Sequence, residues 1–360
     1  MKLFKAVSVG AFMFGAAALA FPSQGCGGSD TNEGNNEGGP GDQTGRVPPS
    51  KPSAGPSDTP ARTFAVNRLF LGETDRNGGP LKDAWKDYGY NLDGLITAKD
   101  SKDVCTRQAG ADSAKQEDGK EGIDNAFGRT VLGFILGLVP TPSKTLNDSI
   151  ADGSFTIMLD LKGLTDDPKQ TNTGLSGNLY VGGDYGDNKK PTFALDDDWP
   201  YRASPIVPIN DAFINEGTFV NGSGGATIEL SLLIQGVSLS LNINRAIITF
   251  KHNPQANELT EGTIAGVIGT EALVQGIEKV AGRISTQLCG GSTLDTIKQT
   301  IRQASDILQD GSNKAGAQCD AISIGLGFTA KRIGPPKTVA QEGTIPPDPC
   351  TNPPADAGTD

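Results

Sequence analysis

The chain has 360 residues, of which 36% are hydrophobic and only 6% aromatic, together with 48 glycines and 23 prolines. This composition is typical of a single loop-rich β domain. A net charge of −11 argues against nucleic acid as a partner, because binding phosphates requires a basic face and the chain has no Lys/Arg cluster longer than a pair.

The N-terminus has the pattern of an export signal. Two lysines precede an apolar run from Ala6 to Phe21, so residues 1–25 are predicted to be a signal peptide and not a membrane span. Cleavage after Ala20 would release a secreted or periplasmic protein. Cleavage before Cys26 would resemble the processing of a bacterial lipoprotein, in which this cysteine is acylated and anchors the protein at the outer membrane or cell surface. The three residues before it match the lipobox of such proteins only in part.

The cysteine count favours the lipoprotein alternative. Five cysteines are an odd number, and acylation of Cys26 leaves an even set for disulfides in an exported chain: Cys105, Cys289, Cys319 and Cys350. Four cysteines allow three pairings. We favour Cys289 with Cys319 and Cys105 with Cys350, because the first bridge would clamp a helix against the last strand.

The segment after the anchor is rich in Gly, Ser, Asn and Pro and has almost no apolar residue. It cannot bury enough surface to offset the entropy of ordering, so residues 26–62 are predicted to be a disordered tether. The tether would hold a single β-rich domain, residues 63–333, away from a membrane surface. Residues 334–360 form a Pro-rich tail.

Aromatic residues gather early in this domain, at Trp85, Tyr88 and Tyr90. They would suit stacking on a sugar, but an aromatic cluster next to leucines favours core packing.

An acidic, glycine-containing stretch follows Cys105. Oxygen ligands at short spacing are what calcium prefers, so the stretch predicts a weak calcium site with four ligands, Asp118, Glu121, Asp124 and Asn125. The EF-hand register is absent. In the alternative interpretation Asp118 lies in a turn and Asp124 or Asn125 caps a helix near 126–139. No other cofactor is expected.

Several segments together form a recognisable combination. They are WKDYGYNLDG at 85–94, Cys105, the Asp-Gly pair at 118–119 followed by GIDNAFG at 122–128, and CDAISIGLGF at 319–328. The combination resembles uncharacterised myxobacterial-type bacterial lipoproteins. This resemblance implies a tethered extracytoplasmic protein from about residue 85 to the C-terminus, and it carries over no catalytic residues.

Alternation of apolar and polar residues predicts strands through the middle of the chain. The clearest runs, Ile228–Ile234 and Val237–Ile243, are joined by Gln235 and Gly236 and predict a β-hairpin. A shift of the pattern at Asn244–Ala246 predicts a β-bulge. Further runs are at 155–161, 179–181, 213–220, 259–268 and 321–328. Together they predict a mainly β (α+β) fold, either an antiparallel β-sandwich or a meander sheet.

The C-terminal third changes to helical spacing, with amphipathic helices expected near 270–285 and 293–309. Each has one apolar stripe, so the two helices are expected to cover the sheet.

An acidic trio stands beside aromatic residues in the loop Asp196, Asp197, Asp198, Trp199 and Tyr201. This arrangement would suit a sugar or a cation. Consecutive carboxylates repel one another unless they are solvated or metal-bound, so the alternative is a solvated loop.

The sequence contains little that indicates catalysis. His252 is the single histidine, and no nucleophile, zinc, Walker or dinucleotide motif is present. We therefore expect a lipid-anchored envelope protein, not an enzyme, that acts as a binding or structural module with a glycan or an envelope protein as partner. The alternative is a carbohydrate-binding or glycosidase-like protein. It stays open because the sequence does not show whether two of the many carboxylates face each other across a cleft, as glycosidases require.

Overall fold

The computed structural model describes residues 45–112, 116–138, 140–186, 189–221, 226–234, 237–340 and 349–350. The predicted signal peptide, Cys26 and the first part of the tether lie outside the described residues. So do Gln235 and Gly236, the expected turn of the hairpin. In the part of the chain that is described, no helix has the length and apolar character needed to cross a membrane.

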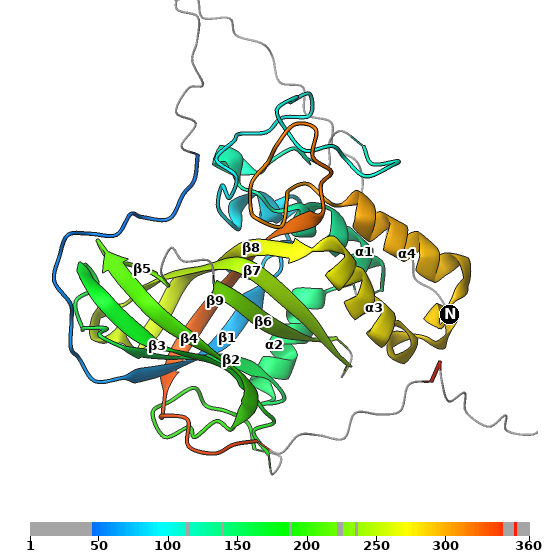
Figure 1. Ribbon diagram of the computed structural model, residues 1–360. Helices are drawn as coiled ribbons and strands as arrows, with labels where there is room; N and C mark the ends of the chain where they lie inside the picture. Colours follow the sequence, from blue (N-terminus) through cyan, green and yellow to red (C-terminus); the bar gives the residue numbers. More distant parts are fainter. Residues whose placement is uncertain are drawn as a thin grey trace, which may run out of the picture. The chain divides into compact units, whose positions relative to one another are not determined.

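Nine antiparallel strands make up the sheet (Figure 1). They are β1 (Arg62–Phe70), β2 (Thr156–Lys162), β3 (Asn172–Gly182), β4 (Tyr201–Asn215), β5 (Thr218–Val220), β6 (Ala226–Ile234), β7 (Val237–His252), β8 (Glu258–Gly269) and β9 (Ala321–Ile333). Their order across the sheet is β5-β4-β3-β2-β1-β9-β8-β7-β6.

The sheet closes on itself at β5. This strand pairs with β4 on one side and with β7 on the other, where Phe219 lies opposite Phe250 and Val220 opposite Thr249. The two phenylalanine rings stack at the seam with centroids 4.4 Å apart. The result is a closed antiparallel barrel of eight strands, from which β6 extends by pairing with β7.

The barrel corrects the predicted sandwich or meander sheet covered by two C-terminal helices, while the mainly β character is confirmed. Alternation assigns each strand a buried and an exposed face, but sandwiches, open sheets and barrels all share that alternation. The closing strand β5 is only three residues long, which is too short for a periodic pattern to indicate where it pairs.

The helices do not form the expected C-terminal cover. Of the four α-helices in the described residues, α1 (Leu132–Leu138) and α2 (Pro142–Ala151) stand between β1 and β2 in the chain. The other two are α3 (Thr270–Ile284) and α4 (Gly291–Gln303). In contacts, α2 packs on β1, α3 on β7, and α4 on α3, so the helices lie on different parts of the sheet.

Two helix boundaries differ from expectation. The helix expected near 126–139 begins as the π-helical turn η4 (Phe127–Val131) before α1. The helix expected near 293–309 ends at Gln303, because Ile307 instead forms a β-bridge with Ala321. Short 3-10 turns are η1 (Ala84–Asp87), η3 (Lys120–Gly122), η5 (Pro254–Ala256) and η6 (Thr286–Leu288).

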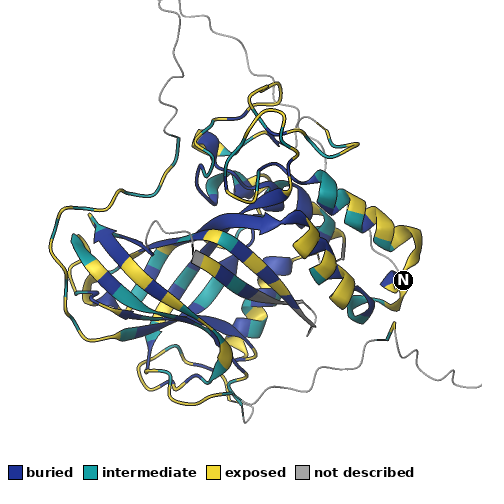
Figure 2. Cartoon of the chain, viewed as in Figure 1, coloured by how far each residue is buried: buried dark blue, intermediate teal, exposed yellow. Residues whose placement is uncertain are grey.

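Inward-facing side chains of the barrel supply the main hydrophobic core. Leu159 lies opposite Leu179, and Ile264 opposite Leu326, and each of these side chains is at most 3% exposed. Figure 2 shows the buried and exposed positions alternating along the strands. The same apolar cluster continues to the helices, so burial of one continuous core holds the barrel and helices together.

The outer face of β9 lacks side chains at two positions, Gly325 and Gly327. A Cβ atom at Gly325 would collide with the Tyr88 backbone, and one at Gly327 with the Tyr88 ring. The long segment between β1 and η4, residues 71–126, is called the excursion below. It therefore packs directly on the backbone of β9, and Tyr88 is buried there. Glycine at these positions serves close approach.

The chain before β1 runs along the outside of the barrel. Pro56 bridges Thr173 of β3, and the Thr173 hydroxyl donates to the Ala54 carbonyl at 2.9 Å. Lys51 pairs with Asp211 of β4 at 2.5 Å. This segment, residues 45–61, is called the strap below, and it is ordered although it belongs to the predicted tether at 26–62.

The predicted hairpin and bulge are confirmed. Strands β6 and β7 pair Leu230 with Leu241, and the register between β7 and β8 shifts between Asn244 and Ile247. Arg245 lies in this bulge with a φ of 52°, a left-handed conformation that is uncommon for a residue other than glycine.

Candidate functional site

All four cysteines predicted to form disulfides do so, but in a different pairing. The bridges join Cys105 to Cys319 and Cys289 to Cys350, with Cα atoms 5.2 and 5.1 Å apart. The favoured pairing, Cys289 with Cys319 and Cys105 with Cys350, is therefore wrong. The excursion places Cys105 beside the start of β9, where the Cys319 N–H donates to the Thr106 carbonyl at 2.9 Å.

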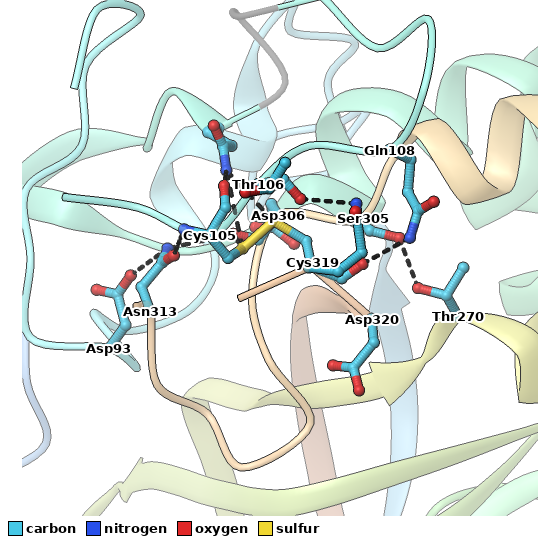
Figure 3. The surroundings of a disulfide bond; sticks show 12 residues. Asp93, Cys105, Thr106, Gln108, Thr270, Ser305, Asp306, Asn313, Cys319 and Asp320 are labelled. Atoms are coloured by element: carbon cyan, nitrogen blue, oxygen red, sulfur yellow. Dashed lines mark hydrogen bonds between the residues drawn. A yellow bond between two sulfur atoms is a disulfide. The ribbon is translucent and has the colours of Figure 1, made fainter. Parts of the chain in front are cut away.

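Polar side chains surround the Cys105–Cys319 bridge (Figure 3). The Gln108 side chain donates to the Cys319 carbonyl at 2.7 Å. Asn313 accepts from the Cys105 N–H at 2.5 Å and donates to the Asp93 carboxylate at 2.9 Å. Both sulfur-bearing residues are at most 2% exposed, so the bridge is an internal staple.

Asp93 and Asp306 lie beside this staple. Together with two further aspartates whose charges act on one another they are called the aspartate cluster below: Asp93, Asp118, Asp124 and Asp306. The Asp124 carboxylate accepts from the Leu92 N–H at 2.7 Å, and that of Asp118 from the Thr97 N–H at 2.5 Å. Each carboxylate thus holds a backbone segment of the excursion.

Asp306 connects the aspartate cluster to the barrel. Its carboxylate accepts from both the N–H and the hydroxyl of Ser323 on β9, at 2.9 and 2.6 Å. The Ser323 hydroxyl oxygen accepts in turn from the Ala126 N–H at 2.8 Å. The cluster therefore joins segments that are far apart in sequence.

Burial raises the pKa values of the cluster. It raises the pKa of Asp118 to about 8, to which the charges of Asp93 and Asp306 contribute. Burial likewise raises the pKa of Asp306 to about 6, although the hydrogen bonds from Ser323 oppose the rise. The pKa values of Asp93 and Asp124 are also raised, chiefly by burial. Carboxyl groups with raised pKa values hold protons that ordinary aspartates release.

Among the described residues, Arg129 is a cation whose charge acts on this region. Its guanidinium lies 5.5 Å from the centroid of the Trp85 ring. Its positive charge lowers the pKa values of Asp118 and Asp306, against the larger effect of burial, which raises them. Its Nε and Nη1 atoms are buried and lack hydrogen-bond partners in the described part of the chain, so its influence on the carboxylates is through space.

The predicted calcium ligands have separate roles. Asp118 and Asp124 belong to the cluster, Glu121 is exposed with a φ of 54°, and the side chain of Asn125 is engaged by backbone groups. Among the residues described, no group of three or more His, Cys, Asp or Glu side chains is placed to hold a metal. Calcium binding stays a prediction.

Asn125 is a structural hub. Its amide nitrogen lies within hydrogen-bond distance of the carbonyls of Trp85, Tyr88 and Gly325, at 3.2, 3.1 and 3.0 Å. Its amide oxygen accepts from the N–H groups of Gly128 and Gly325, at 2.9 and 3.1 Å. Asn125 lies two residues before η4, whose N-cap position is held by Ala126 without a side-chain cap. The main contribution of Asn125 is to fasten the excursion to β9.

The acidic trio does not act as a unit. Asp197 is buried and accepts from the N–H of Thr192 at 2.8 Å and from the Tyr185 hydroxyl at 3.0 Å. Asp196 and Asp198 are exposed. This leaves Asp197 as a loop brace and the other two carboxylates in solvent.

The aromatic residues of that loop are also mainly structural. Trp199 is fully buried and donates from its indole nitrogen to the Gly183 carbonyl at 2.8 Å. Tyr201 is half-buried and meets Tyr180 edge-on at 5.0 Å between centroids. Ligand binding at this loop would rest on Asp196, Asp198 and Tyr201.

His252 is likewise buried at the end of β7. Its Nδ1 lies 2.8 Å from the Asn253 carbonyl, which makes this nitrogen the protonated one. Its Nε2 has no hydrogen-bond partner within the described chain.

A groove on the outer face of the barrel holds an open volume of about 330 Å³. The strap forms one wall, and strands β4, β5, β7 and β8 form the other. Its lining residues are mostly apolar and include no carboxylate: Val47, Pro48, Pro49, Ser50, Lys51, Leu92, Phe213, Val220, Arg245, Ile247, Gly266, Val267 and Gly311. No motif in the sequence marks this groove, because its residues come from seven separate segments.

Fold and sites together define an antiparallel eight-stranded barrel whose outer segments are fastened by disulfides and buried polar groups. Comparison of the chain with protein-family models, with curated proteins and with solved structures finds no match. The resemblance to myxobacterial-type lipoproteins stays a prediction.

Proposed function

We propose that the protein is an exported, lipid-anchored binding module of the bacterial envelope and not an enzyme. The observation that carries this proposal is the pair of disulfides, which join Cys105 to Cys319 and Cys289 to Cys350. Disulfides form and persist in oxidising compartments outside the cytoplasm. With four cysteines engaged, Cys26 is left as the acylation site.

Binding is favoured over catalysis by how the polar groups are used. The carboxylates of Asp124 and Asp306 are buried and bound to backbone or to Ser323. A general acid or base must reach a substrate proton, and these groups face the protein's own segments. The outer groove, in contrast, is open and offers the lining of a small-molecule site.

The alternative of a carbohydrate-binding or glycosidase-like protein has less support. Sugar platforms use exposed aromatic faces, whereas Trp85 and Trp199 are 7% and 0% exposed. These are the two tryptophans of the chain.

The test is the chemistry of the mature N-terminus. The full chain is produced with its own first residues in a bacterium that has an outer membrane, and the N-terminal peptide is analysed by mass spectrometry. We expect a diacylglyceryl-modified Cys26 and a protein that fractionates with membranes, and we expect Cys26→Ser to abolish both. A mature chain that begins after Ala20 with an unmodified cysteine would overturn the lipid anchor.

A further inference from the structure

The groove places apolar side chains on the outside of the barrel. Val220, Phe213 and Ile247 line it from strands β5, β4 and β7. On the outer face of a barrel in water, polar residues are expected. Here Pro48 and Pro49 of the strap form the opposite apolar wall, and the space of about 330 Å³ between the walls stays open.

A single cation is available in this groove. Lys51 also lines it, but its ammonium is paired with Asp211 at 2.5 Å. No hydrogen bond or ion pair to the described residues engages the guanidinium of Arg245. The bulge of β7 holds Arg245 in a left-handed conformation, with φ at 52°.

Gly311 lies next to this arginine. A Cβ atom at Gly311 would lie 2.9 Å from Arg245 Nε and 3.1 Å from Cδ, so the arginine side chain passes directly over the glycine backbone. Gly311 itself has a φ of 74°, which glycine adopts without strain. Arg245 is exposed, and its side chain lies at the groove beside Gly311.

We propose that the groove binds a small organic carboxylate with an apolar body. A guanidinium presents paired N–H donors that match a carboxylate, and the apolar walls would bury the rest of the ligand. The volume lies at the lower end for small-molecule sites, roughly 300–1,000 Å³. Because the groove contains no carboxylate and the chain carries −11, attraction of an anion depends on Arg245 locally. This inference rests on the proposed binding role and specifies its ligand class, but it does not depend on the lipid anchor.

The test uses the full mature chain from residue 26 with Cys26→Ser, so that acylation does not affect the result. Octanoate and its neutral analogue octan-1-ol are titrated by calorimetry and by protein-observed NMR. We expect octanoate to bind at least about tenfold more tightly than the alcohol, the effect of one charge-assisted pair. Arg245→Gln should remove this preference, and Arg245→Lys should keep part of it.

Two further variants make the result specific. Arg202→Gln changes an arginine of β4 that does not line the groove, and it should leave octanoate affinity unchanged. Ile247→Trp fills the groove and should weaken binding of both compounds. Equal affinity for acid and alcohol, no binding of either, or full octanoate affinity in Arg245→Gln would each overturn the proposal. Failure of acylation at Cys26 would leave these measurements intact.

Discussion

Asn125 and Gly325 exchange two hydrogen bonds across 200 positions of the chain, at 3.0 and 3.1 Å. The Asn125 side chain makes the hydrogen bonds that the Gly325 backbone would otherwise make to a neighbouring strand. Because both groups are buried, neither has water as an alternative partner. The excursion is thus attached to β9 in the manner of an additional strand, but through one amide side chain.

Asn125→Ala is therefore expected to lower the free energy of unfolding by about 3 kcal/mol or more, because it leaves several buried backbone groups without partners. Urea denaturation of the purified protein measures this. Asn210→Ala, at an exposed position of β4, is the matched control and should change stability by less than about 0.5 kcal/mol. Equal stability of the two variants would show that the hub contributes nothing.

Gly325→Ala tests the close approach of Tyr88 to β9. The added methyl group would collide with the Tyr88 backbone, so we expect a loss of about 2 kcal/mol or more. Gly133→Ala provides the control, since a Cβ there meets nothing within 4 Å. In helix α1 it should raise stability by up to about 1 kcal/mol. Thermal unfolding of both variants checks that the first is less stable and the second more stable than the parent protein.

The aspartate cluster predicts a pH dependence of stability. The folded-state pKa of Asp118 is about 8, above the value of about 3.9 in unfolded chains. Between these two values the folded protein binds more protons than the unfolded chain. Its stability is therefore highest below about pH 4 for this group and falls as pH rises toward about 8.

Asp118→Asn should reduce that fall, because the amide carries no charge at any pH. The fall in stability is measured as the difference between the unfolding temperatures at about pH 5 and about pH 8.5, because most of the expected change lies between these two pH values. Asp198→Asn removes an exposed carboxylate and controls for the change in net charge. If the two variants and the parent protein lose stability equally with rising pH, the cluster does not store protons.

The two disulfides should differ in their accessibility to reductant. Cys105 and Cys319 are at most 2% exposed, whereas Cys289 and Cys350 are exposed. A mild phosphine reductant is expected to open Cys289–Cys350 in the folded protein and to reach Cys105–Cys319 only after unfolding. Mass mapping of alkylated peptides distinguishes the bridges. Simultaneous reduction of both, or a bridge between Cys289 and Cys319, would contradict the structure.

Removing each bridge should also destabilise the protein. The bonded cysteines are 214 and 61 positions apart, and closing loops of these lengths contributes about 5 and about 4 kcal/mol in the chain-entropy model. We expect the serine pair at 105 and 319 to be the less stable variant, because it also leaves the buried side chain of Gln116 with fewer partners. Denaturant unfolding of the two double serine variants, one at positions 105 and 319 and the other at 289 and 350, shows which has the lower free energy of unfolding.

Local pattern in the sequence was sufficient for several features. The alternation from Ile228 to Ile243 predicted the β6–β7 hairpin, and its interruption near Arg245 predicted the bulge. The odd cysteine count left four residues for disulfides, and all four are paired. Each of these features depends on neighbours in the chain or on a count, so it is present in the sequence itself.

Tertiary structure alone decided the rest. Barrel closure depends on Phe219 meeting Phe250, and it follows from strand twist and stagger accumulated over the whole sheet. The partner of Cys105 and the surroundings of Asp306 depend on which loops the closed barrel brings together. Sequence determined the β character, the hairpin and the set of bonded cysteines. Contacts between distant segments, which no local pattern specifies, produce the closed barrel, the disulfide pairing, the aspartate cluster and the groove at Arg245.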